Sequence, residues 1–283
     1  MNSDYQRKVK GNRLLVLLIV GLALFMLGSS IISMIAMIPL QKITNISGEK
    51  INEALTVFSN YFSNELRNDG LKWSDYAKSY FEADPILFDN IRSFYCAVQF
   101  LTYMPLLVIF VYFLRHDLVN DFKEFKKNFA QNIAIILGAL AGMYILGLIV
   151  VNIYYALGIT DDSANESIIN ILLTSPGKWL MIISVVILAP IVEEMIFRKL
   201  FIDTCETKFK LKPIYAILIS TVLFAFIHVT DLESIKFIFQ YIALALPICV
   251  AYHYSNNNIY VVTIVHIINN LLSVLTVTYI FWL

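Results

Sequence analysis

Apolar runs long enough to cross a lipid bilayer recur along the chain and are separated by polar segments. A transmembrane α-helix needs about 20 consecutive, mostly apolar residues. Seven runs approach or exceed this length, at residues 14–40, 94–114, 133–157, 179–197, 213–229, 237–254 and 259–283. The pattern predicts an all-α fold, a polytopic membrane helical bundle of about seven transmembrane helices.

One long polar stretch, residues 41–92, follows the first apolar run. Within it, residues 51–62 have the apolar spacing of an amphipathic helix. We expect a small helical loop outside the membrane. The pattern thus divides the chain into a basic cytoplasmic tail (1–13), a first transmembrane helix (14–40), an extracytoplasmic helical loop (41–92), transmembrane helices two and three with their connections (93–178), and a core (179–283).

The composition is that of a membrane protein. Hydrophobic residues make up 59% of the chain and charged residues 15%, with a mean hydropathy of +0.72, whereas soluble domains have about 25% charged residues. A formal net charge of zero argues against a nucleic-acid partner, which would require a basic surface. The three cysteines are scattered singly, at Cys96, Cys205 and Cys249, so we interpret them as packing residues rather than a disulfide or metal framework.

The distribution of positive charge predicts the orientation. The N-terminus, the connection 115–131 and the connection 198–212 hold thirteen Lys and Arg residues, whereas the short connections on the other side hold only Lys178 and Lys236. Cytoplasmic segments carry an excess of Lys and Arg. The first apolar run is too long for the core of a signal peptide. We therefore expect a multi-pass protein of the cell membrane, with its N-terminus in the cytoplasm.

The charged segment Pro190 to Arg198 ends the fourth apolar run. Ionisable side chains at membrane depth are costly and usually mark function. On a helix, Glu194 and Arg198 stand at i and i+4, the spacing of an ion pair. Glu193 points about 100° away and needs a partner from another helix. The alternative is that these charges sit at the headgroup level, where polar helix ends are common.

Two further polar insertions lie in the last runs: His228 ends the fifth, and His266 with Asn270 lies inside the seventh. His266 and Asn270 are i, i+4 and share one helix face. A lone histidine in an apolar helix is ordinarily a packing residue. Here three helices each supply polar groups, and burying them unpaired would cost several kcal/mol. We therefore expect them to converge with Glu193 at one site.

Such a site suits hydrolysis. A carboxylate in a partly apolar cavity can act as general base for a water molecule. A histidine beside it can orient the water, and a His/Asn pair can donate to the oxyanion of a scissile carbonyl. The alternative is a zinc ion held by Glu193, His228 and His266. Because the local HExxH motif is absent, we favour glutamate catalysis without metal or other cofactor.

The ordered set Glu193-Glu194-xxx-Arg198, Phe224-xxx-His228 and His266-xxx-Asn270 resembles the three motifs of the CPBP family. This family contains the type II CAAX prenyl endopeptidases and the bacteriocin-processing or self-immunity proteins, and the resemblance covers about residues 179–283. It implies an intramembrane endopeptidase that acts on a membrane-embedded or lipidated peptide. Its implied roles are Glu193 as general base, His228 as the group that helps to hold the water, and His266 with Asn270 as oxyanion donors. Glu194, Arg198 and Phe224 are expected to support these groups.

Two other functions fit the same residues. A non-catalytic membrane scaffold or bacteriocin-immunity protein could keep them as a buried polar network. A transporter could use Glu193 and the histidines as a proton relay, but we find none of the inverted repeats that are typical of transporters. For a peptidase, we expect a cavity that opens toward the cytoplasm.

Overall fold

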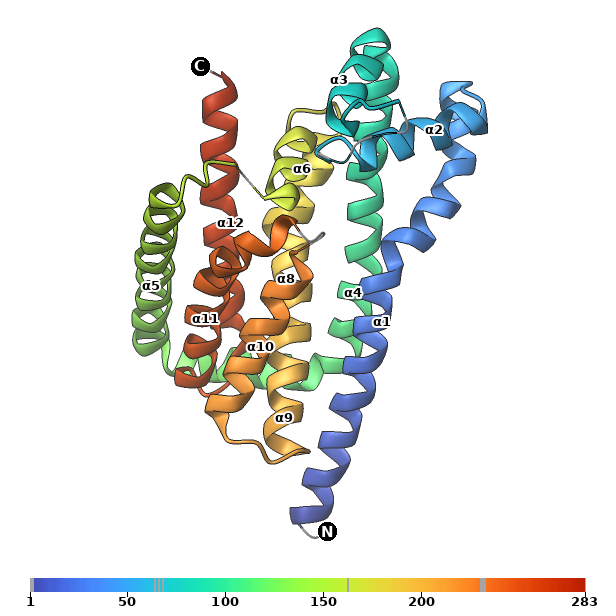
Figure 1. The fold of residues 1–283 in the computed structure, drawn as a ribbon. Helices are drawn as coiled ribbons and strands as arrows, with labels where there is room; N and C mark the ends of the chain where they lie inside the picture. Colours follow the sequence, from blue (N-terminus) through green and yellow to red (C-terminus); the bar gives the residue numbers. More distant parts are fainter. Residues whose placement is uncertain are drawn as a thin grey trace.

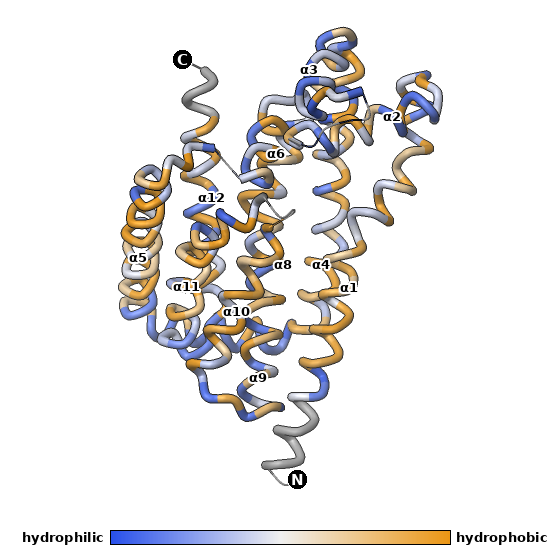
Figure 2. Tube along the Cα trace, viewed as in Figure 1, coloured by the Kyte–Doolittle hydropathy of each residue, from blue (hydrophilic) through white to orange (hydrophobic). Residues whose placement is uncertain are grey.

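The computed structural model describes residues 3–63, 65, 67, 69–161, 163–229 and 233–282. Six helices in these ranges are long and apolar enough to cross a membrane. Four of them are, or lie within, α1 (Ser3–Thr44), α4 (Pro85–Lys127), α5 (Phe129–Ala156) and α12 (Ile259–Trp282). The fifth, Ser234–Tyr254, contains α11 (Ile238–Tyr254). The sixth runs from Lys178 to Thr207. The predicted all-α polytopic bundle is confirmed, and hydrophobic positions fill the middle of these helices (Figure 2).

The helix from 178 to 207 is the centre of the bundle. Of its most apolar stretch, 67% is buried inside the protein, compared with 17% for α1 and for α5. It contains two π-helical turns, in the order α7 (Lys178–Ile183), η1 (Ser184–Leu188), α8 (Ala189–Glu194), η2 (Met195–Ile202) and α9 (Asp203–Thr207). Single π-helical turns inside α-helices are frequent at functional sites. The two predicted carboxylates lie in the short α8 between them.

The fifth predicted span is a short helix. α10 (Pro213–Ile227) has 15 residues, or about 22 Å at 1.5 Å per residue, less than the ~30 Å core of a bilayer. Pro213 starts the helix, where its missing N–H is not needed. His228 is its C-cap residue. At this position the histidine lines a cavity of the bundle.

Segments expected to be loops are largely helical. α1 continues to Thr44 and α4 already begins at Pro85, so the polar stretch holds α2 (Gly48–Ser59) and α3 (Trp73–Ala83). α4 also continues to Lys127, and only Asn128 separates it from α5. The connection 115–131 is thus not a loop. Its apolar residues repeat at helical spacing, and Phe125 packs into the core.

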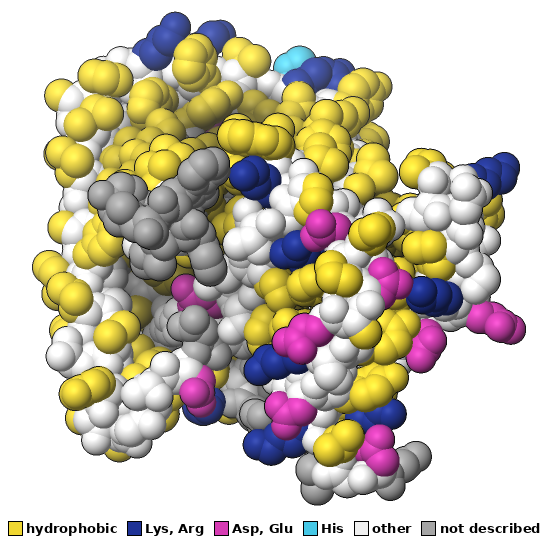
Figure 3. Space-filling model, turned by 90° about the horizontal axis from the view of Figure 1, so that it is seen from above, with side chains coloured by type: hydrophobic (Ala, Val, Ile, Leu, Met, Phe, Trp, Pro, Cys, Tyr) yellow, Lys and Arg dark blue, Asp and Glu magenta, His cyan; other side chains and the backbone are white. Residues whose placement is uncertain are grey.

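The two ends of the bundle differ. α2, α3 and α6 (Ala164–Leu173) lie at one end, and the N-terminus lies at the other (Figure 1). Seen from the α6 end, acidic and basic side chains gather over α2 and α3 (Figure 3). At the opposite end, where the connections rich in Lys and Arg lie, Lys199 is buried and its Nζ lies 2.8 Å from Oδ2 of Asp121. Tyr252 and Asn257 donate to Asp203 at 2.9 and 3.0 Å, so a polar network closes this basic end.

Candidate active site

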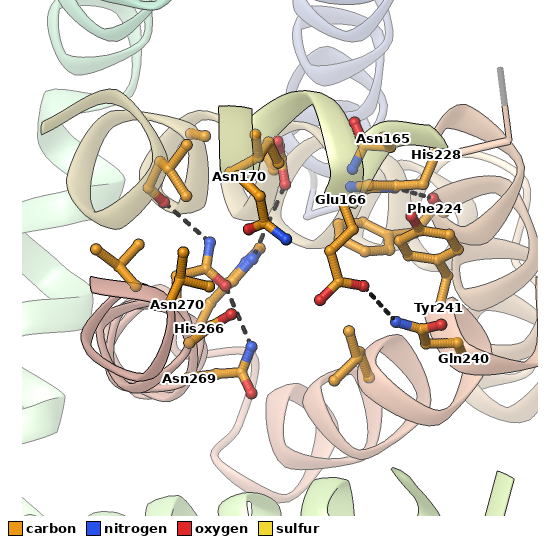
Figure 4. Close-up of a pocket in the computed structure, with 18 of the residues that line it drawn as sticks. Asn165, Glu166, Asn170, Phe224, His228, Gln240, Tyr241, His266, Asn269 and Asn270 are labelled. Atoms are coloured by element: carbon orange, nitrogen blue, oxygen red, sulfur yellow. Dashed lines mark hydrogen bonds and ion pairs between the residues drawn. The ribbon is translucent and has the colours of Figure 1, made fainter. Parts of the chain in front are cut away.

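One cavity of about 200 Å³ brings the predicted catalytic residues together. Its lining includes Glu193 from α8, His228 at the end of α10, and His266 with Asn270 from α12. Phe224 lies on the same wall (Figure 4). The expectation that three separate helices supply one polar site agrees with this arrangement. The roles assigned to the residues stay predictions.

Glu193 faces the cavity and is held by another helix. Its Oε1 accepts a hydrogen bond from the hydroxyl of Tyr103 in α4 at 3.2 Å. Its Oε2 lies 4.0 Å from Nε2 of His266. The side chain is buried, with 6% of the residue exposed. Tyr103 was not among the predicted site residues, since a tyrosine in an apolar run shows no local pattern that reveals its partner.

Glu194 points away from the cavity lining and forms the predicted ion pair. Its Oε2 lies 3.1 Å from Nε of Arg198, and both side chains are fully buried. The guanidinium also lies over the ring of Phe224, 4.6 Å from its centroid. Nη2 of Arg198 donates to the carbonyl of Ala245 at 3.4 Å. These charges are not at the surface of the bundle, because both side chains are fully buried.

The second glutamate also holds His266, which the sequence pattern did not indicate. Nδ1 of His266 lies 2.8 Å from Oε1 of Glu194. An ionised carboxylate can only accept, so Nδ1 carries a proton. The other ring nitrogen, Nε2, therefore faces Glu193 and the cavity. Glu194 thus fixes the orientation of the imidazole.

His228 is oriented by its own helix. Its Nδ1–H donates to the carbonyl of Phe224 at 2.8 Å, one turn earlier. A carbonyl only accepts, so Nε2 is the nitrogen that can accept a hydrogen bond. The ring stacks on Tyr241 of α11 at 4.7 Å and lies 4.6 Å from the ring of Phe224. Phe224 therefore positions His228 through both its carbonyl and its ring.

Asn270 is positioned by the π-helical turn η1. In this turn the N–H of Ala189 donates to the carbonyl of Ser184, five residues earlier. The next residue, Pro190, has no N–H, so the carbonyl of Val185 has no such partner. Nδ2 of Asn270 donates to that carbonyl at 2.9 Å. One amide hydrogen of Asn270 remains for a group in the cavity.

Residues 175–272 match the family model described as type II CAAX prenyl endopeptidase Rce1-like. This segment is similar to the Rce1-like family. The match covers about a third of the chain and contains all the motif residues from Glu193 to Asn270, which confirms the resemblance. Neither the curated proteins nor the solved structures contain a match to the chain.

The Rce1-like family is one of proteases, so the match implies a hydrolase. Together with the six apolar helices, it describes a multi-pass membrane protein embedded in a lipid bilayer. A protease in this position acts on membrane-associated or lipidated substrates.

One wall of the cavity comes from outside the Rce1-like segment. Asn165, Glu166 and Asn170 of α6 line it, together with Gln99 of α4. Because α6 lies opposite the basic end (Figure 1), the cavity lies toward the α6 end of the bundle. The network around Lys199 fills the basic end instead.

The three residues of the zinc alternative, Glu193, His228 and His266, line one cavity, and zinc ligation by them stays a hypothesis. Within the described ranges, no group of three or more His, Cys, Asp or Glu side chains has an arrangement that could hold a metal ion. Nδ1 of His266 and Nδ1 of His228 are both hydrogen-bonded to protein oxygens. The three cysteines are free and buried, at separate places.

Proposed function

We propose that the protein is an intramembrane endopeptidase in which Glu193 activates the water that hydrolyses a peptide bond. The observation that carries the proposal is that the two adjacent glutamates have different partners. Glu194 is neutralised by Arg198, whereas Glu193 lies on the cavity with a hydroxyl donor at one oxygen. A carboxylate held in this way can take a proton at its second oxygen.

In the proposed reaction, Glu193 removes a proton from water, and the water oxygen attacks the carbonyl carbon of the substrate. Nε2 of His228 accepts the second hydrogen of the water and fixes its direction. The oxyanion that forms accepts hydrogen bonds from Nε2–H of His266 and from the amide of Asn270. Glu193 then gives its proton to the leaving nitrogen as the C–N bond breaks. The products are a new carboxyl group and a new amine.

Donation by His266 requires protons on both ring nitrogens. The charges of the cluster agree with this state. Glu193 and Glu194 carry two negative charges, and Arg198 with protonated His266 carries two positive ones, so the set is neutral. A neutral set is favoured because an uncompensated charge in the membrane interior is costly.

We also propose that the basic end faces the cytoplasm, which places the N-terminus there. The cavity then lies on the extracytoplasmic side of the bundle, with α6 in its wall. A substrate segment would reach it from that side or from the bilayer.

A non-catalytic scaffold or immunity protein is the second candidate. The contacts that favour it are those of Glu194, which joins Arg198 and His266 in a buried network. Such a network ties the central helix to α12 whether or not a reaction takes place.

Glu193→Gln separates the two functions. The substitution keeps the size of the side chain and removes its ability to take a proton. We expect purified Glu193→Gln protein in lipid nanodiscs to fold in normal amount and to cleave a library of apolar peptides about 10² to 10⁴-fold more slowly, measured by mass spectrometry. Glu49→Gln, at an exposed site on α2, is the matched control and should cleave normally. Cleavage by the Glu193→Gln protein at the wild-type rate would contradict the peptidase proposal.

A further inference from the structure

Two aromatic rings from different helices lie against the imidazole of His228. Phe224 belongs to α10, the helix that His228 ends, and its ring centroid is 4.6 Å from that of the imidazole. Tyr241 belongs to α11, and its ring stacks on the imidazole at 4.7 Å with the two planes inclined by 27°. All three side chains line the cavity (Figure 4). Tyr241 therefore supports His228 from outside its own helix.

The proposed reaction requires one direction of this imidazole, since its Nε2 must point at the water. The hydrogen bond from Nδ1 of His228 to the carbonyl of Phe224 fixes one ring atom. The last torsion of a histidine side chain has broad minima, so neighbours decide how the ring is turned. Stacked rings at such distances attract each other, and rotation of the imidazole would lose that contact. The ring of Tyr241 thus restricts the rotation that a single hydrogen bond allows.

Tyr241 is itself held at both ends. Its ring is buried, with 6% of the residue exposed, in an apolar cluster with Tyr154, Ala225 and Phe237. Its hydroxyl lies 2.7 Å from Oγ of Ser163. Ser163 is fully buried, so water does not compete for this hydrogen bond. A ring packed on its sides and bonded at its tip is a rigid support.

The hydroxyl contact connects His228 to the helix that forms part of the cavity wall. Ser163 is the N-cap residue of α6, and its Oγ accepts from the backbone N–H of Glu166 at 3.2 Å. A hydroxyl can accept and donate at the same time. Ser163 therefore caps α6 and binds Tyr241 with the same oxygen, so α6, Tyr241 and His228 form a continuous series of contacts.

We propose that Tyr241 is a positioning residue for His228: its ring holds the imidazole in the direction that the reaction requires, and its hydroxyl anchors that ring to α6. The proposal rests on the proposed peptidase function. Tyr241 is not one of the motif residues, and it acts through His228 without touching the reacting atoms.

The first measurement observes the imidazole directly. The chain has four histidines, so the protein is labelled with ¹⁵N-histidine and studied by NMR in detergent micelles. The signals that disappear in His228→Asn are those of His228. In the wild type we expect nuclear Overhauser effects between the rings of His228 and Tyr241, and a single tautomer with its proton on Nδ1. Tyr241→Phe should keep this pattern, whereas in Tyr241→Leu the two nitrogen signals should move toward the average of both tautomers.

The second measurement separates positioning from substrate binding. It uses the apolar peptide that the wild-type protein cleaves fastest. We expect Tyr241→Leu to lower kcat about tenfold with KM unchanged, because the peptide still binds while the water is poorly directed. Tyr241→Phe and Ser163→Gly should each lower kcat about threefold. Glycine is an acceptable N-cap residue, and the double variant should lose no more than either single one, since both remove the same hydrogen bond.

Tyr154→Leu is the matched control. It removes another buried tyrosine of the same apolar cluster, whose hydroxyl donates to the carbonyl of Lys236 at 2.7 Å. This variant should lower the unfolding temperature and leave kcat and the signals of His228 unchanged. Equal effects of Tyr154→Leu and Tyr241→Leu on kcat would show a general loss of packing and overturn the proposal.

Other results would contradict the proposal as well. A rise in KM with unchanged kcat in Tyr241→Leu would assign the tyrosine to substrate binding. Additive losses in Tyr241→Phe and Ser163→Gly would show that the hydroxyl contact does not anchor the ring. Absence of the Overhauser effects in the wild type would overturn the proposal even if Tyr241→Leu did not fold.

The outcomes distinguish this proposal from the peptidase itself. Signals of His228 that respond to Tyr241→Leu, in a protein that cleaves no peptide, would contradict the peptidase and leave the contact that orients the imidazole. Cleavage with an unchanged kcat in Tyr241→Leu would contradict the positioning role and leave the peptidase.

Discussion

Nδ1 of His266 lies 2.8 Å from Oε1 of Glu194, so the imidazole is held by the glutamate that faces away from the cavity lining. The same contact joins α8 to α12. Glu194 therefore acts in two ways: it neutralises Arg198, and it orients a residue that lines the cavity. It is a positioning residue, whereas Glu193 is the proposed catalytic one.

Glu194→Gln should destabilise the fold. It leaves the fully buried Arg198 without a counter-charge, and breaking a buried ion pair at one partner costs about 3 to 5 kcal/mol. Unfolding in detergent, followed by circular dichroism, measures the loss. Glu194→Gln/Arg198→Met should recover much of the stability, because it removes the uncompensated charge. Stability equal to wild type in the single variant would show that the pair does not hold the helices.

Tyr103→Phe should slow catalysis without unfolding the protein. It removes the hydroxyl that donates to Glu193 and keeps the ring that packs against Phe25. We expect kcat to fall about tenfold while KM stays the same, as for loss of one hydrogen bond to a charged group. The exposed Tyr112→Phe serves as control. An unchanged kcat would show that the hydroxyl has no part in positioning the carboxylate.

Removal of metal should leave the activity intact. Protein dialysed against EDTA and then 1,10-phenanthroline is expected to cleave peptides at its original rate, because the proposed mechanism uses only the carboxylate and its neighbours. Loss of activity that zinc restores would favour metal ligation by Glu193, His228 and His266 and would require these side chains to rearrange. Metal content measured before and after dialysis provides the control.

Gly177→Ala should weaken the junction between α4 and the central helix. A Cβ atom at Gly177 would lie 2.9 Å from the Cα of Ser93, too close for backbone to accommodate without movement. Overpacking of this kind typically costs about 1 to 3 kcal/mol. Gly147→Ala, where a Cβ meets nothing within 4 Å, is the matched control and should be neutral or slightly stabilising. Equal unfolding temperatures for the two variants would contradict the close approach.

Stability should fall in acid through Asp84, which lies between α3 and α4. The hydrogen bond from Lys50, and then that from the backbone N–H of Leu87, hold the pKa of this carboxyl below its ordinary value. Because the pKa is lower in the folded state, the contribution to stability is present above the ordinary value of about 3.9 and is lost as the pH falls through the lower folded value. The contribution is small, because the site is partly exposed.

Asp84→Asn isolates this effect, since asparagine also caps helices but does not titrate. Unfolding temperatures measured between pH 6 and pH 2 should converge for the two proteins at the acidic end. Parallel curves would show that Asp84 has the same pKa in both states.

The positions of the loops show which features the local pattern of apolar residues predicts and which it does not. Apolar spacing predicted the helical runs, yet it placed a connection at 115–131, where α4 in fact continues to Lys127. It also counted α10 among the spans, although that helix has only 15 residues. Charged residues on a helix that runs along the surface look like a loop in hydropathy alone, because hydropathy records contact with lipid and not backbone conformation.

The sequence by itself determined the apolar runs that form helices. It also determined two relationships that the helical period sets: the ion pair of Glu194 and Arg198, and the shared face of His266 and Asn270. These depend on residues four positions apart, whose geometry is the same in every α-helix. The tertiary structure decided which helices face one another. It joined Tyr103 to Glu193, His266 to Glu194 and Asn270 to the carbonyl that Pro190 leaves unpaired, and it put α6 in the cavity wall. Such contacts depend on how whole helices pack, and no local spacing along the chain encodes the angle and register of that packing.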